Sequence, residues 1–192
     1  MRAIRSGVLR CVTCTLLAVA LLASGCAPVA GQMEYERYDD PGGRFSLLIP
    51  ASWETELVSS EYNPYVGTRE DQDSGFYDAW IGVTWGPLPC DRSLVDDAAA
   101  WQADILCWGE DLTELSRAEV EVDGRRGLLV ECSRRLEDGE AARHLSLVTE
   151  AYGILWVVTG AVMDGSRYPD YEEAFRTVLE SFVVRGAWAI GG

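Results

Sequence analysis

The amino-acid sequence predicts an α+β fold in which helices flank an antiparallel β-sheet. Three turn signals, Asp123-Gly124, Glu137-Asp138-Gly139 and Tyr152-Gly153, follow one another closely and separate apolar, strand-like segments. Two other segments, 91–106 and 169–181, carry apolar residues at helical spacing. Strands joined by such short turns run antiparallel, so the turns predict a meander accompanied by two helices.

The first strands are expected near the start of the domain. Residues 34–38 form a short strand, and 45–49 form an apolar strand that Pro50 ends. The polar stretch 59–75 is expected to be a loop. Residues 76–85 place large apolar side chains on both faces of a strand, which predicts a sheet covered on both sides.

The later strands and both helix starts carry local signals. Ser93 and Asp96 resemble a capping box at the start of the first helix, and Pro169 suits the first turn of the second. The apolar stripe of the second helix consists of Phe175, Val178, Leu179 and Phe182. The expected strands are 120–122, 127–133, 141–150, 154–161 and a short last strand at 182–184.

The N-terminal segment is expected to be a targeting signal and not part of the fold. Residues 1–10 carry three Arg and no acidic residue, and 11–23 form an uncharged, mostly apolar run of 13 residues. Such a run is shorter than the ~20 residues that span a bilayer, but it suits a signal peptide. The run leads to Leu22-Ala23-Ser24-Gly25-Cys26, which looks like a bacterial lipobox with Ala23 in place of the usual aliphatic residue. The alternative is an ordinary secretory signal with an incidental Cys26.

These segments predict the organisation of the chain. A lipoprotein signal peptide covers 1–25, a lipidated tether 26–33, a single domain 34–185 and a C-terminal tail 186–192. Lipid attached to Cys26 is expected to hold the domain at the extracytoplasmic face of a bacterial cell membrane.

The charge of the chain excludes several classes of function. All 16 basic residues are Arg, against 31 acidic residues, and there is one His, which gives a net charge of −15. Without Lys there is no Schiff-base or P-loop lysine, and one His excludes multi-histidine metal sites. Nucleic acid, whose phosphates need basic surfaces, is not an expected partner. Anionic lipid headgroups repel so acidic a domain, so the attached lipid must do the anchoring.

Three cysteines, Cys90, Cys107 and Cys132, fall within the predicted domain. An oxidising compartment favours one disulfide among them. The helix predicted between Cys90 and Cys107 holds them roughly 20–25 Å apart, beyond the ~7 Å that a disulfide allows between Cα atoms. Cys107 with Cys132 is therefore the expected pair, and three buried thiols are the alternative.

The opening and the close of the domain resemble those of PsbP-like domains. The segment Arg44-Phe45-Ser46-Leu47-Leu48-Ile49-Pro50-Ala51-Ser52-Trp53 contains a strand that ends in Pro, then two residues, then Trp. The Tyr-rich helix near Tyr168 and Tyr171, with the closing Leu179-Glu180-Ser181-Phe182, also fits. The resemblance is shared loosely with the Ran-binding Mog family and LpqN-type actinobacterial lipoproteins. It implies an α/β/α sandwich over roughly 35–184 and a domain that binds or assembles.

No catalytic or metal-binding residue is predicted. His144 shares a predicted strand face with Ser146, but two residues apart on one strand is poor geometry for proton transfer. The chain also lacks the G-x-S-x-G nucleophile elbow. The acidic stretch 70–75 fails the EF-hand pattern, so a solvated loop with at most weak calcium binding is expected there.

The expected function is non-catalytic binding or scaffolding of a protein partner in the cell envelope, without a cofactor. The first alternative is a small-molecule or cell-wall ligand bound in a groove lined by some of the seven Trp. The second is a hydrolase that uses paired carboxylates.

Overall fold

The computed structural model describes residues 33–59, 64–70, 79–87, 112–136, 139 and 141–186. The strands are β1 (Tyr35–Asp39), β2 (Phe45–Pro50), β3 (Trp53–Ser59), β4 (Pro64–Glu70), β5 (Ala79–Pro87), β6 (Leu112–Val122), β7 (Arg125–Arg135), β8 (Ala141–Ala151), β9 (Ile154–Val162) and β10 (Val183–Val184). A 3-10 turn, η1 (Gly165–Arg167), leads into helix α3 (Tyr168–Glu180).

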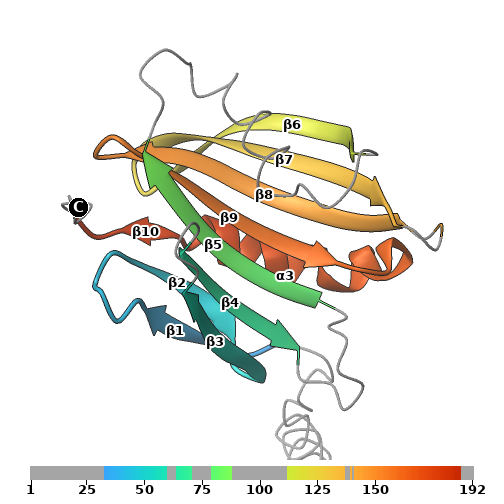
Figure 1. The fold of residues 1–192 in the computed structure, drawn as a ribbon, viewed down its shortest axis with the longest axis horizontal. Coiled ribbons are helices and arrows are strands. Elements are labelled where there is room, and N and C mark those ends of the chain that lie inside the picture. The colour runs from blue at the N-terminus through green and yellow to red at the C-terminus, as the bar shows by residue number, and fades with distance from the viewer. Residues whose placement is uncertain are drawn as a thin grey trace, which may run out of the picture. The chain divides into compact units, whose positions relative to one another are not determined.

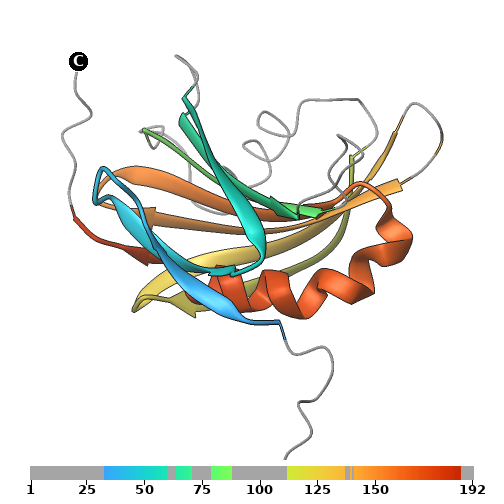
Figure 2. The same ribbon diagram turned by 90° about the horizontal axis from the view of Figure 1, so that it is seen from below.

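The strands form two antiparallel sheets (Figure 1). The small sheet has the order β1-β2-β10, and the large sheet has the order β3-β4-β5-β9-β8-β7-β6. Helix α3 and the β1–β2 hairpin lie on one side of the large sheet (Figure 2), which we call its first face. The opposite side is called the second face. This arrangement confirms the predicted α+β fold class.

The hairpin turns form as their residues predict. Asp123 and Gly124 both have positive φ (53° and 69°), as do Tyr152 and Gly153 (58° and 73°). Two-residue turns of this kind match the twist of antiparallel strands, and they fix the register of β6 with β7 and of β8 with β9. The predicted antiparallel meander is thereby confirmed.

Strand β9 lies at the centre of the large sheet, and all nine of its residues are buried. Its first face packs against α3, whose predicted stripe of Phe175, Val178 and Leu179 is buried. Next to them, Phe45 brings β2 into the same core, with its ring centroid 5.9 Å from that of Trp156. The first face therefore carries the main hydrophobic core.

The second face carries a smaller group of buried apolar side chains, which we call the second-face cluster. It consists of Leu128, Val130, Cys132, Val148, Leu155 and Val157, with the partly buried Leu112 beside it. Both faces of the large sheet thus bear buried apolar side chains, as the pattern over 76–85 predicted. The helix predicted over 91–106, which the α/β/α arrangement needs as its second layer, lies outside the described residues.

Three details of the predicted strand map are wrong. The stretch 59–75, expected to be a loop, contains β4, which pairs with β3 and β5. Strand β6 begins at Leu112, eight residues before the expected start at Val120. Strand β3, at Trp53–Ser59, is not among the expected strands. In these segments cross-strand pairing prevails over a largely polar local sequence.

Candidate functional site

Polar side chains gather on the second face, beside the second-face cluster. The register places Glu114, Cys132, His144 and Ala161 in one row across β6, β7, β8 and β9. The neighbouring row contains Ser146 and Thr159. Side chains in such rows point to the same side of a sheet, so these groups share one environment.

His144 is the least expected member of this group. Its side chain is buried, with 4% of the residue exposed, and neither ring nitrogen has a hydrogen-bond partner in the described part of the chain. Burial, and secondarily the charge of Arg134, lowers the pKa of His144 to about 4. The imidazole is therefore neutral at physiological pH, with one unused donor and one unused acceptor.

Ser146 does not form a catalytic pair with His144. The Ser146 hydroxyl lies 3.0 Å from the Thr159 hydroxyl, and both residues are buried. The two hydroxyls therefore satisfy one another across β8 and β9, and His144 contributes nothing to their hydrogen bond.

Cys132 is buried on the second face, opposite His144 in the register. Burial, then the nearby Glu114, raises the pKa of the Cys132 thiol to about 11, so it is a poor nucleophile. Its expected disulfide partner, Cys107, lies outside the described residues, as does Cys26. The disulfide and the lipid attachment both stay predictions.

Glu114, Cys132 and His144 are residue types that bind zinc, and they lie in one row. The Glu114 carboxylate, however, accepts two hydrogen bonds from Arg117, at 3.0 and 2.5 Å. Within the described ranges, no group of three or more potential ligands could hold a metal ion. Of the acidic stretch 70–75, only Glu70 is described, at the end of β4.

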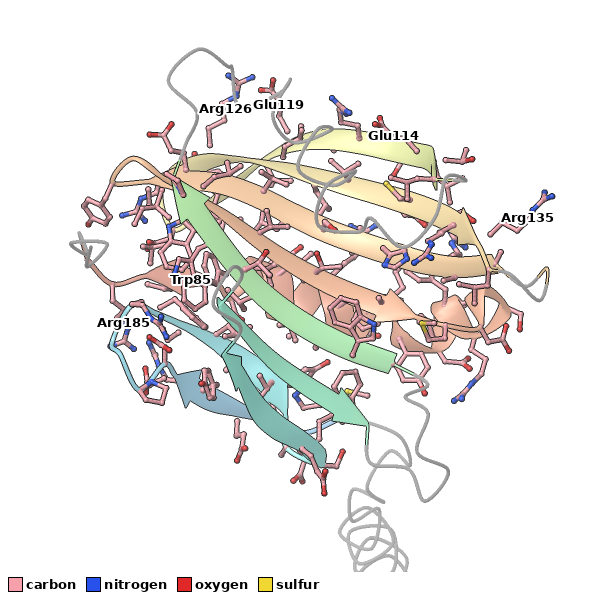
Figure 3. All side chains as sticks on the ribbon, in the orientation of Figure 1. Trp85, Glu114, Glu119, Arg126, Arg135 and Arg185 are labelled. Atoms are coloured by element: carbon pink, nitrogen blue, oxygen red, sulfur yellow. The ribbon has the colours of Figure 1, made fainter. Side chains whose placement is uncertain are left out.

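The β6 edge is highly exposed among the strands whose burial the structure describes. Residues 113–119 are exposed without interruption, although a strand in a sheet normally buries one face. The register of β6 with β7 shifts between Glu114 and Ser116, and Leu115 at this bulge is 48% exposed. Figure 3 shows Glu114, Glu119 and Arg126 along this edge. We call residues 113–119 the β6 ribbon.

A second polar group lies where β1, β2 and β10 meet the large sheet. The Arg44 guanidinium donates two hydrogen bonds to the buried Asp40 carboxylate, at 2.6 and 2.7 Å, and stacks over Trp85 at 4.1 Å. Burial raises the pKa of Asp40, but the hydrogen bonds from Arg44 outweigh it and lower the pKa overall. Arg185, near Trp85 in Figure 3, pairs with Asp39. These pairs hold the turn between β1 and β2.

The Trp residues that the structure describes do not form an open groove. Trp53 and Trp156 are buried in the main core. Trp85 is partly buried against the same core, and Trp80 lies on the second face. No sequence signal pointed to the β6 ribbon beyond its many charges, and none pointed to Arg134. No described helix is long and apolar enough to cross a membrane.

No protein-family model matches the chain. No curated protein matches it either.

Solved structures resemble the chain in fold. The solution structure of cyanobacterial PsbP (CyanoP) from Synechocystis is 20% identical with a TM-score of 0.59, and the match covers 83% of this chain and 98% of that one. The Ran-binding protein Mog1p of Saccharomyces cerevisiae is 10% identical with a TM-score of 0.59, over 80% and 96% of the two chains. LpqN of Mycobacterium tuberculosis, involved in cell envelope biogenesis, is 13% identical with a TM-score of 0.54, over 81% and 92%. The described domain thus has the PsbP/Mog-like α+β fold.

Proposed function

We propose that this chain is an extracytoplasmic lipoprotein, anchored through Cys26, whose domain binds a protein partner of the cell envelope without catalysing a reaction. The lipobox-like sequence supports the anchor. The fold supports a binding domain, since LpqN, which shares it, is involved in cell envelope biogenesis. The domain boundaries 34–185 and the tether 26–33 belong to the same proposal.

The observation that carries the binding role is the exposure of the β6 ribbon. Its outer edge has no strand partner within the described part of the chain, so backbone donors and acceptors face outward. Charged side chains and the bulge at Leu115 protect such an edge from indiscriminate pairing. A partner that matches these charges and covers Leu115 satisfies both the backbone and the apolar side chain.

The chemistry of the second face supports a role other than catalysis. His144 stays neutral to about pH 4, Ser146 is hydrogen-bonded to Thr159, and the pKa of Cys132 is raised. A general base needs a pKa near the working pH, and a thiol nucleophile needs a lowered pKa.

The test is a crosslinking pull-down of the tagged chain from its native membrane. The wild type is compared with Cys26→Ala, which removes the anchor, and with Leu115→Arg, which alters the β6 ribbon. Met163→Arg places the same charge at another exposed apolar residue and is the matched control. We expect one protein to be recovered with wild type and Met163→Arg, and to be depleted at least tenfold with Leu115→Arg.

Recovery of the same protein with Leu115→Arg would remove the β6 ribbon from the proposal. An empty pull-down with well-expressed wild type would count against a stable protein partner as the main role.

A further inference from the structure

Two cationic or potentially cationic side chains with unused polar atoms lie next to each other on the second face. Arg134 lies on β7 and His144 on β8, diagonal to one another, because Cys132 pairs with His144 and Arg134 with Ala142. Diagonal neighbours on one face of a sheet are within reach of long side chains. The charge of Arg134 also acts on the His144 ring.

The polar atoms of this pair are buried but unused. Both ring nitrogens of His144 and Nε of Arg134 are shielded from solvent, and none of them forms a hydrogen bond with a residue that the structure describes. Buried polar groups in folded proteins nearly always have a partner, and a missing partner costs ~1–3 kcal/mol. A site with several such atoms together therefore points to a group that lies outside the described part of this chain.

The missing partner is an anion. The chain holds 31 acidic residues, yet within its described part no carboxylate pairs with Arg134. Two described acidic side chains on the neighbouring strands pair with other residues, Glu114 with Arg117 and Glu131 with Arg143. An acceptor with two oxygens could take a hydrogen bond from Arg134 Nε and another from the His144 N–H.

The neighbours of the pair in the sheet register are small or apolar. The residues opposite Arg134 and His144 on adjacent strands are the small Ala142, Ala161 and Cys132. Partly exposed apolar side chains stand at the ends of the two rows, Leu112 on β6 and Trp80 on β5. The site lies at the end of the sheet where Arg135 projects (Figure 3).

We propose that Arg134 and His144 bind the carboxylate of a small organic acid whose apolar part contacts Trp80 or Leu112. The oxygens of this acid accept hydrogen bonds from both side chains over the floor of small residues. No bond is made or broken, and the site is one for binding. The proposal goes beyond the protein-partner role and does not depend on the β6 ribbon.

The single His of the chain makes the test specific. The full chain is labelled with ¹⁵N-histidine, so its ring NMR signals all come from His144. Octanoate and benzoate are titrated as probes, with octanol and benzamide as uncharged counterparts and inorganic phosphate as a different anion. Arg134→Gln removes the proposed ion pair. Arg135→Gln removes one positive charge at the next residue, on the opposite face, and is the matched control.

We expect octanoate or benzoate to shift the His144 signals saturably and to raise the pKa of His144, because a nearby anion favours the imidazolium. The apparent dissociation constant should rise at least tenfold in Arg134→Gln and stay within twofold in Arg135→Gln. Thermal unfolding of each variant checks that it is folded.

A weak specific ligand has a dissociation constant of ~1 mM, so each acid is titrated to about ten times that concentration. If neither acid shifts the His144 signals saturably in this range, the proposal is overturned. An equal affinity in Arg134→Gln, or an equal response to octanol or benzamide, would also overturn it. Tighter binding of inorganic phosphate than of both acids would overturn the assignment to carboxylates.

Discussion

At the residue scale, the buried His144 makes the stability of the domain depend on pH. Its pKa of about 4 in the folded state lies below the value of ~6.5 expected in the unfolded chain. As the pH falls from 6.5 to 4, the unfolded state gains a proton that the folded state does not, so folding is disfavoured. The shift corresponds to a loss of about 3 kcal/mol in the free energy of unfolding across this window. Below pH 4 both states are protonated at His144 and its contribution stops changing.

The variant His144→Gln should remove this dependence, because Gln fills a similar volume and does not titrate. Denaturant unfolding measured from pH 7.5 to 4.5 checks it: the wild-type curve should fall more steeply than that of the variant. Carboxylates such as Asp40 titrate in both proteins and cancel in the comparison. Parallel curves would show that His144 is hydrated or has a partner in solution.

At the element scale, the contact between α3 and β9 depends on the absence of a side chain at Gly160. A Cβ at this position would lie 2.4 Å from Cγ and Cδ1 of Phe175, whose ring is fully buried. The ring cannot move freely, because Tyr168 and Tyr171 lie against it with centroids at 6.1 and 6.0 Å. Overpacking of this kind costs ~1–3 kcal/mol.

Gly160→Ala should therefore lower the free energy of unfolding by about 1–3 kcal/mol. Gly186→Ala, where an added Cβ meets no atom within 4 Å, should change it little. Combining Gly160→Ala with Phe175→Leu should cost less than the sum of the two single changes, because the smaller side chain leaves room for the methyl group. Additive costs would show that the loss arises elsewhere than in this contact.

The same elements show how far the sequence predicts the structure. The turns at Asp123-Gly124 and Tyr152-Gly153 and the stripe of α3 follow local rules, so they were predicted correctly. Strand β4 was missed because the polar, turn-rich stretch around it carries no alternation, and only pairing with β3 and β5 makes it a strand.

The candidate site was less predictable than the fold. A sequence does not show that Arg134 and His144 share one face, since that follows from the register between β7 and β8. Nor does it show that β6 is an edge strand with 113–119 exposed, because its position in the sheet depends on non-local pairing. The burial of Cys132 agrees with both alternatives for the cysteines, a disulfide with Cys107 and buried thiols.

At the scale of the whole molecule, charge decides how the domain can lie near a membrane. The chain has a net charge of −15, and most Arg side chains described in the structure pair with Asp or Glu, so little positive charge is left to attract anionic headgroups.

If the lipid on Cys26 is the only anchor, Cys26→Ala should move the protein from the membrane pellet to the soluble fraction at both low and high salt. Cys14→Ala, which makes the same change inside the apolar run, should leave it in the pellet. Release of Cys26→Ala by high salt alone would reveal a basic contact with the membrane, since salt screens such attraction. Retention at every salt concentration would show instead that the apolar run 11–23 anchors the chain.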